Sequence, residues 1–207
     1  MRKINMSKMP SLQHKSIYNI FSYFISCAFI GWIFETLFVL IQTGHMTERG
    51  LLFINHNPGQ YFPFLNSVPL LANIPLFWGL PIIEIYGIGG CIIVFCLGKL
   101  KNIPAIFFIG LVILTLLELG TSYICEIVAH KQYWDYSADF LNFQGRICLR
   151  SSIAWGILSV FTIKFLKAKM DLIWKKEKSI RNYKVVTTLL FAYTIFCMIL
   201  KYFFDTK

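Results

Sequence analysis

Long apolar segments dominate this chain and limit the folds that it can adopt. A helix that crosses the hydrocarbon core of a bilayer needs about 20 mostly apolar residues. Five segments come close to this length, at residues 17–41, 80–98, 103–127, 151–167 and 185–204. Only 14% of the chain is charged, whereas a soluble domain carries roughly 25%. The sequence therefore predicts an all-α, polytopic membrane protein with about five transmembrane helices.

One transmembrane domain is expected to fill residues 17–204, after a basic arm at residues 1–16 and before a short tail at residues 205–207. The apolar connection between the first and second spans contains a proline every five or six residues from Pro58 to Pro81. Proline breaks a continuous helix because it lacks a backbone N–H and its ring clashes with the preceding turn. We therefore expect an interfacial or re-entrant loop there, with a sixth span as the alternative.

Lysine and arginine are distributed unevenly between the connections. Of the 20 such residues, fourteen lie in the N-terminal arm, at Lys99 and Lys101, and between Lys164 and Lys184. The remaining six lie in the other two connections and at the C-terminal end. Cytoplasmic connections of membrane proteins carry the excess of lysine and arginine. The sequence thus predicts a multi-pass protein of the cell membrane with a cytoplasmic N-terminus and an external C-terminus.

The net charge of +10 would suggest a nucleic-acid partner if the protein were soluble. Here the cations lie between apolar segments, which favours membrane lipid as the partner and disfavours nucleic acid. The segment from Lys164 to Lys184 mixes lysine with aromatic and aliphatic residues, a pattern typical of a helix on an anionic membrane surface. The alternative is a docking surface for a cytoplasmic partner.

Familiar catalytic and metal-binding motifs are absent from the sequence. The six cysteines include no CxxC pair, so they are interpreted as small core residues rather than as a disulfide framework or a zinc site. His45 and Glu48 have HxxE spacing, but no HExxH motif accompanies them. A P-loop and a GxSxG elbow are also absent. We expect no metal and no cofactor, and the sequence favours a non-enzymatic protein while leaving an enzyme open.

Four glutamates fall within the outer half of the expected spans, namely Glu35, Glu84, Glu118 and Glu126. A charge near the bilayer centre costs at least about 2.5–3.5 kcal/mol, so these acids should face the bundle interior and find partners there. Arg49 and Arg146 are the candidate partners, because a guanidinium forms two hydrogen bonds to one carboxylate. The pattern predicts a polar chamber open to the outer leaflet. The alternative is a buried ion-pair network that only stabilises the bundle.

The connection KQYWDYSADFLNFQGRICLR, at residues 131–150, is polar and aromatic although apolar segments flank it. Its Trp134 and Tyr136 are typical of the belt at the lipid headgroups. Asp135 and Arg146 are candidates to pair with charged groups on the spans. We interpret the connection as a lid or plug over the polar chamber. The alternative is an ordinary external loop.

Six sequence blocks occur in the order found in one known family. They are FIGWIFET (29–36), RGLLF (49–53), IYGIGG (85–90), LLELGTSYICE (116–126), WDYS (134–137) and NFQGRICLRSSIAWG (142–156). With these blocks the chain resembles the CmpB-like, type IV family of ABC-transporter permeases over about residues 20–165. The resemblance implies a small, helical, polytopic membrane protein with a transport-related role.

Most positions selected for their charge also match the family pattern. The candidate residues of the polar chamber are Glu35, Arg49, Tyr86, Glu118, Glu126, Trp134, Asp135, Tyr136, Asn142 and Arg146. The chain departs from the pattern at Glu48 and Glu84, where the family has asparagine and proline, and in the Pro-rich insertion. Glu84 is therefore specific to this chain, and its place in a shared site stays open.

Three functions are compatible with these features. The first is a membrane component of a transport system, similar to an ABC-type permease, with a cytoplasmic ATPase or another membrane subunit as its partner at residues 99–102 or 164–184. The second is a membrane-embedded enzyme or binder that acts on the headgroup of a lipid or another amphiphile. The third is an accessory protein whose polar network only stabilises the bundle. The family resemblance favours the first.

Overall fold

The computed structural model describes residues 17–44, 50–55, 76–176 and 180–205. Its regular structure is mostly helical. Four segments are long and apolar enough to cross a membrane, namely Ile17–Ile41, Ile103–Ala129, Leu149–Asp171 and Lys184–Lys201. They correspond to four of the five expected spans, and their length and composition support a membrane location.

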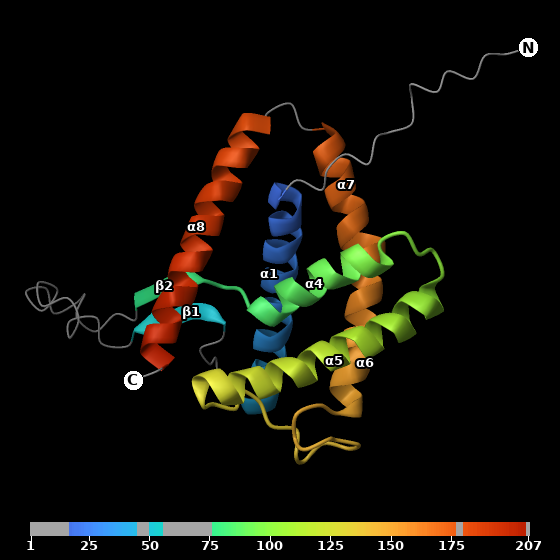
Figure 1. Ribbon diagram of the computed structural model, residues 1–207, viewed down its shortest axis with the longest axis vertical. Helices are drawn as coiled ribbons and strands as arrows, with labels where there is room; N and C mark the ends of the chain where they lie inside the picture. The colour runs from blue at the N-terminus through green and yellow to red at the C-terminus, as the bar shows by residue number, and fades with distance from the viewer. Residues whose placement is uncertain (1–16, 45–49, 56–75, 177–179, 206–207) are drawn as a thin grey trace, which may run out of the picture.

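The helices α1 (Ile17–Thr43) and α8 (Ile180–Asp205) run along the long axis of the molecule, as does the helix formed by α6 (Leu149–Phe161) and α7 (Lys167–Lys176) (Figure 1). The start of α1, the end of α7 and the start of α8 lie at one end, which we call the α7 end. The start of α6, the α5–α6 connection and the end of α8 lie at the opposite end, which we call the α6 end.

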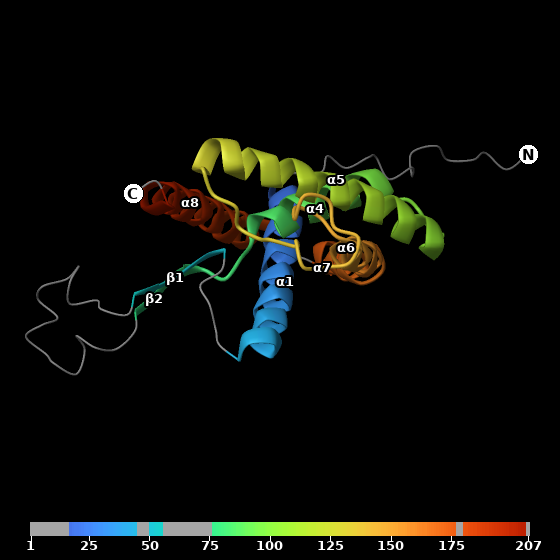
Figure 2. The same cartoon turned by 90° about the horizontal axis from the view of Figure 1, so that it is seen from below.

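The helices α4 (Glu84–Leu97) and α5 (Ile103–Ala129) form an antiparallel pair that lies obliquely across α1 and α6 (Figures 1 and 2). Asn102 caps the start of α5 by accepting the backbone N–H of Ala105 at 3.2 Å. With 14 residues, α4 is about 21 Å long at about 1.5 Å per residue, less than the roughly 30 Å of a hydrocarbon core. The span expected at residues 80–98 is therefore a shorter helix, because the chain before Glu84 is extended.

Glycines bring α4 close to its neighbours. A Cβ atom at Gly87 would lie 2.6 Å from the ring of Phe24 in α1. A Cβ atom at Gly89 would lie 2.9 Å from the side chain of Leu114 in α5. Small residues at such positions allow the backbones of membrane helices to pack tightly.

The larger buried cluster lies where α1, α4, α5 and α6 meet. It contains Tyr23, Ile93, Val94, Leu97, Ile106, Leu114, Trp155 and Ile163. These residues come from separate apolar segments of the sequence, so the core depends on helix packing rather than on any one helix.

A two-stranded antiparallel sheet follows α1, so the fold is mostly helical rather than all-α as expected. Strand β1 (Leu51–Asn55) pairs with strand β2 (Leu76–Leu80). Gly50 precedes β1 with a φ of 64°, and a side chain there would collide with the carbonyl of Ile82. The Pro-rich stretch that we expected to form an interfacial or re-entrant loop lies at residues 56–75, outside the described residues.

One turn of π-helix, Thr162–Leu166, joins α6 to α7 without interrupting the helical column. Beyond it, Asp171 accepts a hydrogen bond from the hydroxyl of Tyr23 at 3.1 Å and pairs with Lys167 at 2.5 Å. These contacts hold α7 against α1 on the far side of the π-helical turn.

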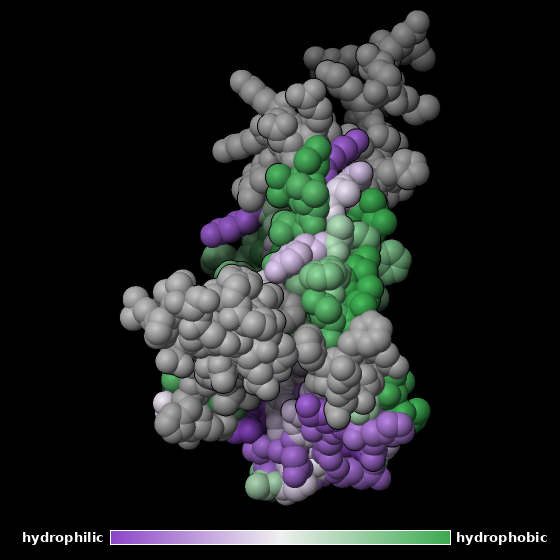
Figure 3. Space-filling model, turned by 90° about the vertical axis from the view of Figure 1, so that its left-hand side faces the viewer, coloured by the Kyte–Doolittle hydropathy of each residue, from purple (hydrophilic) through white to green (hydrophobic). Residues whose placement is uncertain are grey.

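Large apolar side chains cover the outer surface of the helices. On α8 the exposed ones include Val185, Leu189, Phe196 and Ile199. Figure 3 shows one face on which hydrophobic residues extend over the upper part and the right-hand side, and hydrophilic residues gather at the lower end, which is the α6 end. Exposed apolar surface of this extent is unfavourable in water but is suited to contact with lipid tails.

Candidate functional site

Glu118 lies in the second half of α5 and is only 4% exposed. Its carboxyl group accepts hydrogen bonds at 3.0 Å from Tyr136 at Oε1, and from Ser151 and Trp155 at Oε2. An ionised carboxylate accepts hydrogen bonds at both oxygens and donates none, so converging donors suit its charged form. No lysine or arginine pairs with Glu118 in the described part of the chain. Hydrogen bonds, rather than an opposite charge, therefore hold this acid in the interior.

The two donors on α6, Ser151 and Trp155, are held in position by the way that helix begins. Ser151 and Trp155 are four residues apart, so they lie on the same face. Cys148 caps the helix, because its thiol accepts the Ser151 N–H at 3.4 Å and its own N–H donates to the Ser151 hydroxyl at 3.3 Å. The Ser151 hydroxyl also lies 3.0 Å from the Cys148 carbonyl. This capping box holds the hydroxyl beside Glu118.

Tyr136 reaches Glu118 from the α5–α6 connection rather than from a helix. Its backbone N–H donates to the carbonyl of Gly145 at 2.8 Å, which folds the connection back on itself. Gly145 has a φ of 68°, a conformation that glycine adopts readily. Burial, together with the adjacent Glu118 carboxyl group, raises the pKa of Tyr136 above its ordinary value. The hydroxyl therefore stays protonated at neutral pH and remains a donor.

A second acid is connected to this group through an aromatic pair. Glu35 of α1 accepts a hydrogen bond from the hydroxyl of Tyr86 in α4 at 3.0 Å. The Tyr86 ring packs against Trp155, with 4.8 Å between the ring centroids. Because Trp155 donates to Glu118, the contacts extend from Glu35 to Glu118 across four helices. We call these residues, with Tyr136 and Ser151, the Glu118 network.

Arg146 binds the same side of α5, closer to the end of that helix. Its Nη1 donates to the Ser122 hydroxyl at 2.9 Å, its Nη2 pairs with Glu126, and its guanidinium lies 4.1 Å from the centre of the Tyr123 ring. Glu118, Ser122 and Glu126 are spaced four residues apart, so one stripe of α5 faces the connection. The spacing of the two acids, eight residues apart in the sequence, is the local signal of this shared face.

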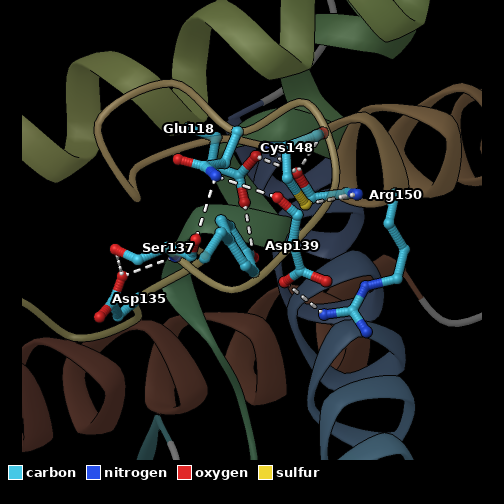
Figure 4. A network of polar contacts seen from close by, with 9 residues as sticks. Glu118, Asp135, Ser137, Asp139, Cys148 and Arg150 are labelled. Carbon is cyan, nitrogen blue, oxygen red and sulfur yellow. Dashed lines mark hydrogen bonds and ion pairs between the residues drawn. The ribbon is translucent and has the colours of Figure 1, made fainter.

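The connection is also held together from within. Asp135 accepts hydrogen bonds from the hydroxyl and the backbone N–H of Ser137, at 2.5 and 2.8 Å. These bonds lower the pKa of Asp135 below its ordinary value. Asn142 donates to the carbonyls of Ser137 and Asp139. Figure 4 shows Ser137 beside Asp135 and Arg150 beside Asp139. The Arg150 guanidinium pairs with the Asp139 carboxylate at 2.9 Å. Asp135 was expected to pair with a charged group on the spans, but its partner is Ser137.

The other expected residues have different positions. Trp134 donates from its indole N–H to the Arg146 carbonyl at 2.8 Å, so it supports the connection. Glu84, which is specific to this chain, pairs with Lys201 of α8 at 3.7 Å. Arg49 lies outside the described residues. Within those residues, no group of three histidine, cysteine or acidic side chains could hold a metal ion.

The space beside the Glu118 network is small. A cavity of about 20 Å³, lined in part by Tyr86 and Trp155, lies where α1, α4, α5 and α6 meet. Such a volume holds about one water molecule. The polar groups therefore pack against one another in this structure, and the open chamber expected from the sequence stays a prediction.

Two donors to Glu118, and Ser122, were not among the residues selected from the sequence. Ser151 and Trp155 lie in the NFQGRICLRSSIAWG block, four residues apart, which is the signal that could have indicated a shared helix face. Ser122 lies midway between Glu118 and Glu126, where the same four-residue spacing applies. Uncharged residues carry no charge signal in a sequence, so a search based on acids and arginines misses them.

One comparison with known proteins identifies the family of this chain. A family model described as "Putative ABC-transporter type IV" matches residues 22–202. No curated protein and no solved structure matches the chain. The matched range contains the Glu118 network, Arg146 and every described helix in whole or in large part. The chain therefore belongs to the family described as "Putative ABC-transporter type IV", whose name suggests a membrane protein of the ABC-transporter type.

Proposed function

We propose that this chain is a membrane component of a transport system, similar to an ABC-type permease, and that a cytoplasmic ATPase docks near its α7 end. The observation that carries the proposal is a contact between two basic segments far apart in the sequence. The side chain of Lys164 donates to the carbonyl of Lys101 at 2.6 Å. The basic docking surface formed there consists of Lys99, Lys101, Lys164, Lys167 and Lys169.

The charge of this surface indicates both its side of the membrane and its partner. Lysine-rich connections remain in the cytoplasm, so we place the N-terminus inside and the α6 end, with its C-terminus, outside. Lys99, Lys101 and Lys169 are exposed. A positive patch of this kind favours association with a negative patch on another protein, where it raises the association rate and selects the orientation. An ATPase with an acidic docking face is the partner that fits.

One helical column links the docking surface to the Glu118 network. Trp155 and Ser151 lie on α6, and Lys169 lies on α7 of the same column, beyond the π-helical turn. π-helical turns inside longer helices are frequent at functional sites. A displacement of α7 by the ATPase is therefore transmitted to the donors that hold Glu118. The α5–α6 connection, which supplies Tyr136, acts as the external gate.

Copurification tests the proposal directly. The tagged protein is expressed at native level, extracted in a mild polymer, and its associated proteins and lipids are identified by mass spectrometry. We expect one ATPase in stoichiometric amount. The double substitution Lys101→Glu with Lys169→Glu reverses two exposed charges of the docking surface and should release that ATPase.

Lys131→Glu is the matched control, because Lys131 is an exposed lysine at the α6 end. It should leave the ATPase bound. Equal yield and equal elution volume of the variants in size-exclusion chromatography separate loss of docking from loss of folding. Absence of any ATPase, or its retention by the folded double variant, contradicts the proposal.

A second candidate function is binding of an amphiphile headgroup at the α6 end. One observation favours it. Nε of Arg146 is buried and, among the described residues, has no hydrogen-bond partner. The adjacent Tyr123 ring gives an apolar wall, and a phosphate or carboxylate oxygen would satisfy the N–H. One enriched lipid or amphiphile, lost in Arg146→Ala, with no ATPase present, would select this function over the first.

A further inference from the structure

A groove lies between α1 and α8 at the α7 end. Its volume is about 200 Å³ and it is lined by Ile17, Tyr18, Phe21, Thr187, Thr188 and Phe191. Figure 1 shows α1 and α8 converging toward this end. An apolar cavity of about 150 Å³ is large enough for benzene. The groove therefore has room for a short stretch of hydrocarbon.

The two ends of the groove differ in character. At its inner end, Phe21 and Phe191 meet edge to face, with 5.0 Å between the ring centroids. At its outer end, Lys184 places its amine 5.7 Å from the centre of the Tyr18 ring. Lys184 and Phe191 are seven residues apart on one helix, or about 10 Å at about 1.5 Å per residue. The groove is thus a mostly apolar slot with a cation at its mouth.

The hydroxyl of Thr188, on the wall of the groove, has a hydrogen-bond partner within the protein and does not require water. The hydroxyl of Thr188 donates to the Lys184 carbonyl at 2.8 Å, within α8. Thr187 is 6% exposed.

Among the described residues, no acidic side chain forms an ion pair with Lys184. The cation at the mouth is therefore available to an anion from outside the chain.

We propose that this groove binds one anionic phospholipid, with part of an acyl chain between Tyr18 and Thr188 and its phosphate beside Lys184. Both helices are candidate membrane spans, so the groove opens to a medium of acyl chains. Lysine near the membrane surface attracts anionic headgroups. A second copy of the chain fits less well, because the groove is small and a stable protein interface buries about 800 Å² on each partner. The site is separate from the docking surface and from the Glu118 network.

Native mass spectrometry of the full-length protein tests the site. The protein is delipidated in mild detergent and titrated with dioleoyl phosphatidylglycerol, or with dioleoyl phosphatidylcholine for comparison. We expect one phosphatidylglycerol to bind in preference to phosphatidylcholine. Lys184→Gln should reduce this preference about fivefold, which is the effect of about 1 kcal/mol for one lysine at a membrane surface. Thr188→Phe fills the groove and should weaken binding of both lipids.

Lys131→Gln provides the matched control, since Lys131 also lies over a tyrosine ring, 5.2 Å from the centre of Tyr133, but at the α6 end. It should leave the preference unchanged. Lys184 is exposed, so its replacement keeps the test informative if Thr188→Phe does not fold. Equal effects of Lys131→Gln and Lys184→Gln overturn the proposal, as does unchanged binding in folded Thr188→Phe. A dimer that Thr188→Phe dissociates would assign the groove to a second copy instead.

Discussion

Replacing Tyr136 by phenylalanine tests whether the Glu118 network holds a charged carboxylate. The substitution keeps the ring and removes the hydroxyl that donates to Oε1 of Glu118 at 3.0 Å. The other two donors, Ser151 and Trp155, both bind Oε2. In the described part of the chain, the variant therefore leaves Oε1 without a donor.

The size of the effect follows from the charge of the acceptor. A hydrogen bond to a charged group contributes about 1.5–3 kcal/mol, and one between neutral groups about 0.5–1.5 kcal/mol. Tyr136→Phe should therefore lower the free energy of unfolding by about 1.5–3 kcal/mol in the native background. In a Glu118→Gln background the same change should cost only about 0.5–1.5 kcal/mol, because the partner is then neutral. The difference, about 1–1.5 kcal/mol, is the coupling between the two residues.

Unfolding in mixed micelles, followed by far-ultraviolet circular dichroism as the denaturing detergent is increased, measures all four proteins of the cycle. Tyr123→Phe is the matched control. Its hydroxyl donates to the neutral amide oxygen of Gln144 at 2.7 Å, and its ring remains beside Arg146. This control should have the same small effect in both backgrounds. An equal cost of Tyr136→Phe in both backgrounds would refute a charged Glu118 at this site.

Three further predictions follow from other contacts. Gly110→Val should reduce the amount of folded protein recovered from membranes, because a Cβ there collides with the neighbouring helix, whereas Gly120→Ala should be tolerated, since nothing lies within 4 Å of its Cβ position. Ser137→Ala should raise the pKa of Asp135 toward its ordinary value of 3.8, as measured by NMR of the labelled carboxyl carbon. The stabilisation from Asp135 is present above the ordinary pKa and is lost as the pH falls through the lowered one, so Asp135→Asn should remove that acid-dependent change. Arg146→Lys should increase proteolysis of the α5–α6 connection in detergent, because an ammonium cannot reproduce the forked donors of a guanidinium; proteolysis at the native rate would contradict this.

Much of the helical architecture was predictable from the sequence because it depends on local composition. In hydrocarbon, a chain must satisfy its backbone hydrogen bonds internally, so an apolar run of about 20 residues forms a helix wherever it lies. The expected segments 103–127 and 185–204 each fall within an observed helix, α5 and α8. The shared face of Glu118 and Glu126 was likewise predictable, because helix periodicity relates residues four and eight positions apart.

The two-stranded sheet was not predictable from the same information. β1 and β2 satisfy each other's backbone groups across a gap of some 20 residues in the chain. Their segments are apolar, as a helix or an interfacial loop would also be. Only the pairing shows that the chain before Glu84 is extended and that α4 is short.

The candidate site depended on tertiary structure in the same way. The sequence identified Glu118 and Arg146 by their charge, which is costly in a membrane domain, and Tyr136 as an aromatic residue typical of the headgroup belt. It did not indicate that Tyr136 binds Glu118 while Arg146 binds Glu126. Any basic or hydroxyl group within reach can satisfy a carboxylate, and reach is set by how the helices pack. Composition thus determined that these side chains need partners, and the fold of the α5–α6 connection decided which partners they have.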